Sequence, residues 1–332
     1  MASSILKLQS QTLRSAGHPN PFLQQKTHPW TLSFPKKHSH QPLHLTEKPI
    51  IPSLQIQSSL STPSTPPTSK EDAILQAKAC LSTTLQKSLN NPKLVGKLKK
   101  VRQPRYQVEI PVTDDSPTFL TQLAYEIFKN IPIRRKSLPF KILIVWPSPA
   151  LKDSAIEAFQ SHSLDNIEHS DISSVTDGGK RILSSADVTV FLAPESSQLT
   201  VIKTVVDSLY PRPVVIFNPR WGFEEENDFG DLNGFVSSFE VIYSFVGLEV
   251  RGVLSKRKGA VFRCVRDGVV SGEKWAVLVE DERELKVVSR FKARPSIGDV
   301  ESVLYNLMAI NSPITKSAKF LRDLVSNVTG RK

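Results

Sequence analysis

The pattern of apolar and polar residues predicts two amphipathic helices, with a strand between them. Apolar residues recur at three- and four-residue steps over residues 73–89 and again over 119–128, which places them on one helical face. Ser69 with Asp72 three residues later, and Ser116 followed by Pro117, are typical of helix starts. Between the helices, YQVEIPV alternates between apolar and polar residues and predicts a short strand.

Residues 140–219 alternate between continuous apolar runs and helical patterns. Three runs are mostly apolar, as strands covered on both faces must be: FKILIVWP, DVTVFLAP and RPVVIFNP. Helical patterns follow the first two runs; IEHSDI is a weaker strand candidate, and DGGKRILSSA a short helix or turn. This alternation predicts an α/β fold with a mostly parallel, helix-covered, Rossmann-like sheet that lacks a dinucleotide fingerprint.

The helical period disappears after Asp231. Residues 239–291 are interpreted as consecutive strands, which predicts an antiparallel meander that either extends the same sheet or packs beside it. Its expected turns are Ser255–Gly259, Asp267–Gly268, Ser271–Glu273 and Asp281–Glu284. Terminal helices are predicted after Ser296 and after Ser312.

The first 69 residues show no period and differ in composition from the remainder. They contain ten prolines, many Ser and Thr residues, and a single acidic residue, Glu47. This composition matches a transit peptide, and the opening Met-Ala-Ser-Ser is similar to chloroplast examples; a disordered regulatory tail is the alternative. The predicted organisation is therefore a leader over 1–69 and one α/β domain over 70–332. Within that domain we expect a parallel part (70–230), a meander (231–295) and C-terminal helices (296–332).

Charge and cysteine content narrow the functional classes. The net charge of +11 falls to +6 once the +5 of residues 1–69 is subtracted, and no apolar run is long enough for a membrane span. The basic clusters Lys97–Arg105, Arg134–Lys136 and Lys256–Lys258 lack interleaved aromatics, so we interpret them as solvated faces or docking points for an acidic partner or an anionic membrane surface, rather than as nucleic-acid sites. The two cysteines, Cys80 and Cys264, favour a reducing compartment, and Cys80 is interpreted as a small buried apolar residue.

Motifs for catalysis, cofactors and metals are missing from the sequence. It contains no Walker phosphate loop, no G-x-G-x-x-G and no G-x-S-x-G nucleophile elbow. Outside the leader only His162 and His169 remain, and neither has partners in a metal-binding or triad pattern. We therefore predict no catalytic residue, no metal ligand and no cofactor.

One candidate crevice remains, at the end of the apolar run 214–217. Ligands of open α/β sheets bind beyond the carboxyl ends of the strands, where Asn218, Arg220 and Trp221 follow this run. Asp177 and Gly178 could contribute a phosphate-binding turn to the same crevice. The alternative, which residue types alone favour, is a structural corner in which Asn218 forms a turn and Arg220 pairs with an acid of the following loop.

Several segments together resemble one known family. They are KEDAILQAKACL, YQVEIPV, VVIFNPRW and KWAVLVEDERELKVVSRFKARPSIGDVESVL, within residues 70–310. In this order they resemble a plastid and cyanobacterial family of domains of unknown function that includes the chloroplast Low PSII Accumulation protein three. Asn218, Pro219 and Arg220 match the family pattern, and the family carries over no catalytic residue.

The resemblance implies a non-enzymatic chloroplast auxiliary protein. Its expected role is to assist assembly of photosystem II or other thylakoid complexes by protein binding, in the stroma or peripherally on the thylakoid membrane. Its expected partners are subunits or assembly proteins of photosynthetic complexes. Two alternatives stay open: a nucleotide- or small-anion-binding enzyme that uses the crevice near Asn218, and a stromal RNA-associated factor.

Overall fold

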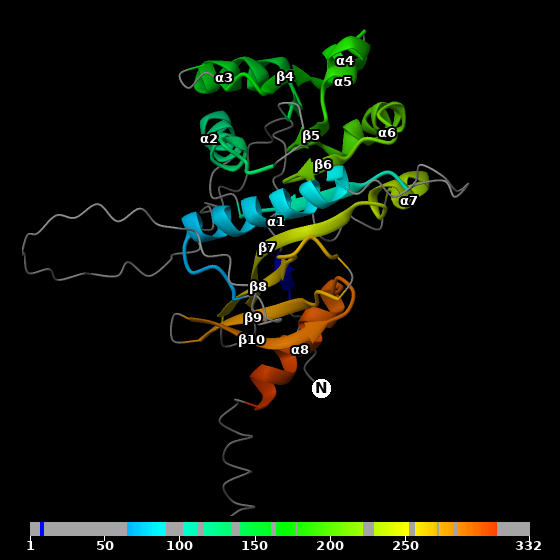
Figure 1. Cartoon of the computed structure of the whole chain (residues 1–332). Coiled ribbons are helices and arrows are strands. Elements are labelled where there is room, and N and C mark those ends of the chain that lie inside the picture. The colour runs from blue at the N-terminus through cyan, green and yellow to red at the C-terminus, as the bar shows by residue number, and fades with distance from the viewer. Residues whose placement is uncertain are drawn as a thin grey trace, which may run out of the picture.

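The computed structural model describes residues 7–9, 65–90, 102–111, 116–133, 140–160, 164–176, 178–221, 229–251, 256–270, 272–281 and 284–310. The strands of these residues form one sheet in the order β10-β9-β8-β7-β2-β6-β5-β3-β4, and β1 also pairs with β7 (Figure 1). Pairing of β2 with β7 joins a parallel and an antiparallel part. The meander therefore extends the parallel sheet, which settles the choice that the sequence left open.

The parallel part follows the predicted alternation of strands and helices. Its strands are β2 (Arg105–Glu109), β3 (Ile142–Trp146), β4 (Ile167–Asp171), β5 (Val188–Leu192) and β6 (Val214–Phe217). Every residue of β3, β5 and β6 is buried, because helices cover both faces of these strands. The prediction of a helix-covered parallel sheet is confirmed.

The antiparallel part consists of β7 (Glu240–Arg251), β8 (Lys256–Cys264), β9 (Trp275–Asp281) and β10 (Glu284–Phe291). The predicted turn at Ser255–Gly259 is wrong, since Lys256–Gly259 belong to β8 and pair with β7. Gly259 is needed for a different reason: a Cβ at this position would lie 2.3 Å from the carbonyl oxygen of Leu278. A glycine inside a strand can thus mark close approach of a neighbouring backbone instead of a turn.

The predicted leader contributes one short strand to this sheet. β1 (Lys7–Gln9) pairs antiparallel with Glu249–Arg251 of β7, although the sequence suggested no regular structure here. β7 is longer than β2, which pairs with it only up to Ser244, so the far end of β7 has an edge available for another strand. The other residues before Thr65 lie outside the described residues, as does the helix predicted after Ser312.

Helices cover the two faces of the sheet, as Figure 1 shows for α2 and α3 opposite α4 and α6. The α1 face packs against α1 (Lys70–Asn90), α2 (Pro117–Phe128) and α3 (Pro149–Gln160). Ser69 and Ser116 accept hydrogen bonds from Asp72 N and Phe119 N, so both predicted helix starts are confirmed. The opposite face, called the α8 face, carries the remaining helices: α4 (Ile172–Thr176), α5 (Lys180–Ser185), α6 (Leu199–Ser208), α7 (Asn233–Val236) and α8 (Ile297–Ile310).

The apolar core of the α8 face is divided in two. One cluster lies between α4–α7 and strands β3, β5 and β6, and the other between α8 and strands β7, β8 and β9. The α1 face, in contrast, has a continuous cluster that runs from α3 to β9. The gap between the two clusters of the α8 face lies over β2, at the centre of the sheet.

Candidate binding site

Asn218 closes the corner at the end of β6. It is buried, with φ of 46°, in the left-handed region that Asn adopts more readily than most residues. Its backbone N–H donates to Val108 O at 2.9 Å, and its side-chain Oδ1 accepts from Ile110 N at 2.7 Å. Asn218 therefore joins the carboxyl ends of β6 and β2, while its Nδ2 has no hydrogen-bond partner among the described residues.

Arg220 and Trp221 continue this corner toward neighbouring elements. Arg220 N donates to Pro194 O at 2.8 Å, and its guanidinium lies 3.6 Å from a carboxylate oxygen of Glu195, just after β5. Trp221 is buried and packs edge-on against Phe229, with 5.8 Å between ring centroids. In the described part of the chain, Arg220 therefore pairs with Glu195, which precedes it in the sequence. The acidic loop 222–228, which we predicted to supply its partner, lies outside the described residues.

The sheet does not place the glycine turn beside Asn218. Gly178 follows β4 and α4, and two strands, β3 and β5, separate β4 from β6. Gly178 has φ of 148°, and a Cβ on Gly179 would lie 2.6 Å from the Cα of Val175. These two glycines allow the tight connection from α4 to α5, and Asp177 lies outside the described residues.

A polar cluster occupies the gap on the α8 face. β2 alternates, so Tyr106 and Val108 enter the core of the α1 face while Gln107 and Glu109 lie on the other side. Glu109 is 8% exposed; its carboxylate accepts from Gln107 Nε2 at 2.6 Å and from Ser244 Oγ at 2.5 Å. Arg294 completes the cluster, with its Nη2 3.1 Å from Glu109 Oε1. The two oxygens of this buried carboxylate therefore interact with three partners, Gln107, Ser244 and Arg294.

A cavity of about 510 Å³ opens beside this cluster. Residues of both apolar clusters of the α8 face line this cavity. Val236 and Phe239 belong to the cluster beneath α4–α7, and Val241 and Trp275 belong to the cluster beneath α8. This volume lies within the range of about 300–1,000 Å³ typical of ligand pockets. The cavity thus forms where the coverings of the parallel and antiparallel parts meet.

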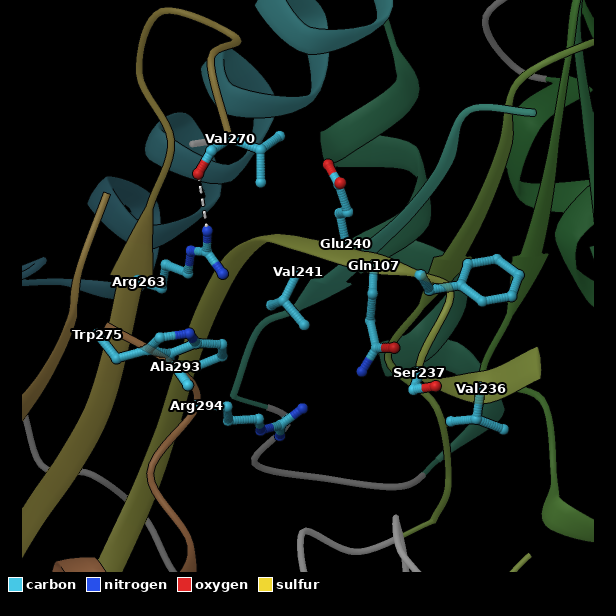
Figure 2. A pocket seen from close by; sticks show the side chains of 11 residues that line it. Gln107, Val236, Ser237, Glu240, Val241, Arg263, Val270, Trp275, Ala293 and Arg294 are labelled. Carbon is cyan, nitrogen blue, oxygen red and sulfur yellow. Dashed lines mark hydrogen bonds between the residues drawn. The ribbon is translucent and has the colours of Figure 1, made fainter. Parts of the chain in front are cut away.

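Two arginines and a tryptophan dominate the chemistry of this cavity. Figure 2 shows Arg263 and Arg294 on either side of Trp275, and their guanidinium carbons lie 5.4 and 5.3 Å from the centroid of the indole. The indole restrains both guanidinium groups by cation–π attraction. Arg263, Trp275 and Arg294 come from β8, β9 and the segment after β10, so only the fold brings them together.

The two arginines differ in how their charge is balanced. Arg294 pairs with Glu109, whereas Arg263 donates to the carbonyl of Val270 at 3.0 Å and forms no ion pair with a described carboxylate. Its Nε is buried without a hydrogen-bond partner among the described residues. Burial lowers the pKa of the Arg263 guanidinium, and the negative charges of Glu240 and Glu273 only partly oppose this effect. An anion in the cavity would stabilise this partly buried cation.

One signal for this site lies in the sequence, in the alternation of YQVEIPV. The strand predicted there places Gln107 and Glu109 on the same face. A strand at the centre of a sheet with Gln and Glu on one face must place these groups against polar partners or an opening. The prediction of a strand alone, without its position in the sheet, did not reveal this consequence. The roles of Arg263, Trp275 and Arg294 had no comparable signal, because they depend on strand order.

His169 is held in a structural contact. His169 Nδ1 accepts from Trp146 Nε1 at 3.1 Å, and burial lowers the pKa of His169 to about 4.

In the described part of the chain, no group of three or more His, Cys, Asp or Glu residues is placed to hold a metal ion. None of the helices in that part is long and apolar enough to cross a membrane.

Comparison with known proteins identifies the family. A family model described as a domain of unknown function (DUF1995) matches residues 67–302. The chain belongs to this family. The matched range includes the whole sheet from β2 to β10 and the residues that line the cavity. A search of curated proteins found no match.

Proposed function

We propose that this DUF1995 protein is a non-enzymatic auxiliary protein that binds an acidic segment of a partner protein in the cavity on the α8 face. The observation that carries this proposal is Arg263, a partly buried guanidinium beside a cavity, which forms no ion pair with a described carboxylate and is only partly compensated by the charges of Glu240 and Glu273. A carboxylate matches the planar fork of arginine, and the apolar walls would accept the side chains that flank it. The occupant we propose is therefore a carboxylate with apolar neighbours.

The polar groups of the cavity favour binding over catalysis. Arginine stays protonated near neutral pH and cannot serve as a general base. Glu109, the buried carboxylate beside the cavity, is held by Gln107, Ser244 and Arg294. Glu240 is exposed, and in Figure 2 its side chain points away from Arg294. We therefore propose that the polar groups of the cavity bind and orient an anion and do not act as acids or bases on it.

The biological setting that we propose comes from the sequence. The resemblance to the family of Low PSII Accumulation protein three and the acid-poor leader both support a chloroplast protein that assists assembly of photosystem II or another thylakoid complex. We propose that it works in the stroma or peripherally at the thylakoid. A fluorescent fusion of residues 1–69 should enter chloroplasts, and alkaline washing should release the mature protein from thylakoids.

A pull-down from chloroplast extract tests the binding function. Arg263→Leu should reduce recovery of the partner at least tenfold, since truncating one member of a buried charge pair costs about 2–5 kcal/mol. Arg290→Leu on exposed β10 is the matched control, because it removes the same charge from the neighbouring antiparallel strands. Equal recovery with both variants would contradict the cavity as the binding site, and recovery of RNA or a nucleotide instead of a protein would contradict the function.

A further inference from the structure

The two cysteines of the chain lie in direct contact although they are 184 positions apart in the sequence. Cys80 is on the buried face of α1, Cys264 is the last residue of β8, and their sulfur atoms are 3.3 Å apart. Both side chains are buried, with 1% and 3% exposed. Because the sequence contains no third cysteine, each of these thiols has one intramolecular partner available.

The neighbouring contacts show how α1 is held against the antiparallel part at this point. A Cβ on Gly268, in the turn after β8, would lie 2.9 Å from the carbonyl oxygen of Thr83. Lys87 Nζ donates to Asp267 O at 3.4 Å in the same turn. The packing of α1 on this turn therefore brings Cys80 and Cys264 together, and little rearrangement is needed to join them. Closing the gap from 3.3 Å to the sulfur–sulfur bond of about 2.0 Å requires a movement of roughly 1.3 Å.

We infer that Cys80 and Cys264 are a disulfide site, at which a small-molecule or protein disulfide oxidises the pair and links α1 covalently to β8. In the first step one cysteine loses its proton, and its thiolate attacks the oxidant disulfide and releases one thiol. In the second step the other cysteine displaces the remaining half of the oxidant as a second thiol. The chain loses two protons and two electrons, and the oxidant accepts them and is reduced to two thiols.

Burial makes this site slow to react in the folded protein. The contact with Cys264 and the apolar surroundings raise the pKa of the Cys80 thiol, so the reactive thiolate is scarce while α1 is docked. Oxidation therefore requires local opening of α1 or takes place during folding. The same burial protects the finished disulfide from reductants, which distinguishes it from an exposed catalytic pair.

The disulfide would stabilise the fold because it closes a long loop. Between Cys80 and Cys264 lie all of the parallel part and the first two strands of the meander. Cross-linking such a loop restricts the unfolded chain strongly. We expect the Tm of the oxidised protein to exceed that of the reduced protein by on the order of 5–15 °C.

The test uses the full chain, unfolded in urea and refolded with either reduced or oxidised dithiothreitol. With the oxidised reagent we expect loss of both titratable thiols, a mass lower by two hydrogen atoms, a monomer on non-reducing electrophoresis and the higher Tm. Cys80→Ala and Cys264→Ala should each abolish the change in Tm. In the folded wild type, oxidation should be slow and should accelerate at urea concentrations below the unfolding transition.

Several results would overturn the inference. These are an oxidised chain that refolds with an unchanged or lower Tm, a disulfide-linked dimer as the main product, or two thiols that stay titratable after refolding with the oxidant. Because wild type refolded with reduced dithiothreitol is its own reference, a variant that fails to fold would not obscure the answer. The experiment involves no binding partner, so its outcome is independent of the proposed function.

Discussion

The parallel and antiparallel parts of the sheet use their polar residues differently. In the parallel part, helices bury both faces, and the polar residues at the end of β6 bond to neighbouring strand ends, as Asn218 does with Ile110. In the antiparallel part, β10 remains half-exposed, and the junction with β2 contains a cavity beside Arg263 and Arg294. The carboxyl ends of parallel strands are the usual binding edge of such sheets, yet Arg263, a partly buried cation with no ion pair to a described carboxylate, lies at the junction. Altering the parallel part should therefore change stability, and altering the cavity should change binding.

The largest effect on stability should come from Glu109, which joins the two parts. Glu109→Leu leaves Arg294, Gln107 and Ser244 without their common acceptor, and we expect it to reduce the free energy of unfolding by about 3 kcal/mol. Urea unfolding measures this loss, with Glu284→Leu on exposed β10 as the control. A loss no greater than that of the control would show that the junction does not depend on this cluster.

Acid should destabilise the parallel part through His169. Its pKa is about 4 in the folded protein, below its ordinary value of about 6.5, so the unfolded chain binds the proton more readily. The stabilisation is complete above pH 6.5 and is lost as the pH falls toward 4, by about 2–3 kcal/mol. Unfolding measured across this range should show a steeper loss for the wild type than for His169→Gln, and parallel curves would contradict the prediction.

The corner at Asn218 should affect stability and leave binding intact. Asn218→Leu leaves the buried Ile110 N–H unpaired and places a bulky residue at positive φ, which should cost about 2 kcal/mol. Asn218→Gly tolerates the backbone angle and should cost less. Thermal melts beside a partner pull-down separate the two roles. An unchanged melt with lost binding would make the strand end the functional site and reverse our comparison of the two parts.

Arg220→Lys should have the smallest effect. The Arg220 side chain and its partner Glu195 are 27% and 46% exposed, and ion pairs near the surface contribute less than about 1 kcal/mol. We expect a decrease in Tm of at most a few degrees and unchanged recovery of the partner. Loss of binding with lysine here would indicate a need for the planar guanidinium fork, and hence a ligand at this corner.

Local signals in the sequence determined most of the elements. Ser69 and Ser116 begin helices because their hydroxyls accept hydrogen bonds from the first turn, a contact between residues three positions apart. Except for Thr189, the runs at 142–146, 188–192 and 214–217 are apolar because helices cover both faces of these strands, so composition alone revealed their burial. The turn predicted at Gly259 is wrong because the reason for a glycine there is the backbone of β9, a neighbour that only the folded chain supplies.

Tertiary structure alone decided which distant residues meet. The order of strands places β2, whose apolar and polar residues alternate, between β6 and β7. Gln107 and Glu109 of β2 therefore lie in the polar gap at the centre of the sheet. It also brings Arg263, Trp275 and Arg294 around one cavity and sets Cys80 against Cys264. The sequence determined which faces of each element are apolar, because burial selects residues one position at a time. Pairing between elements depends on the packing of the whole chain, and no local pattern records it.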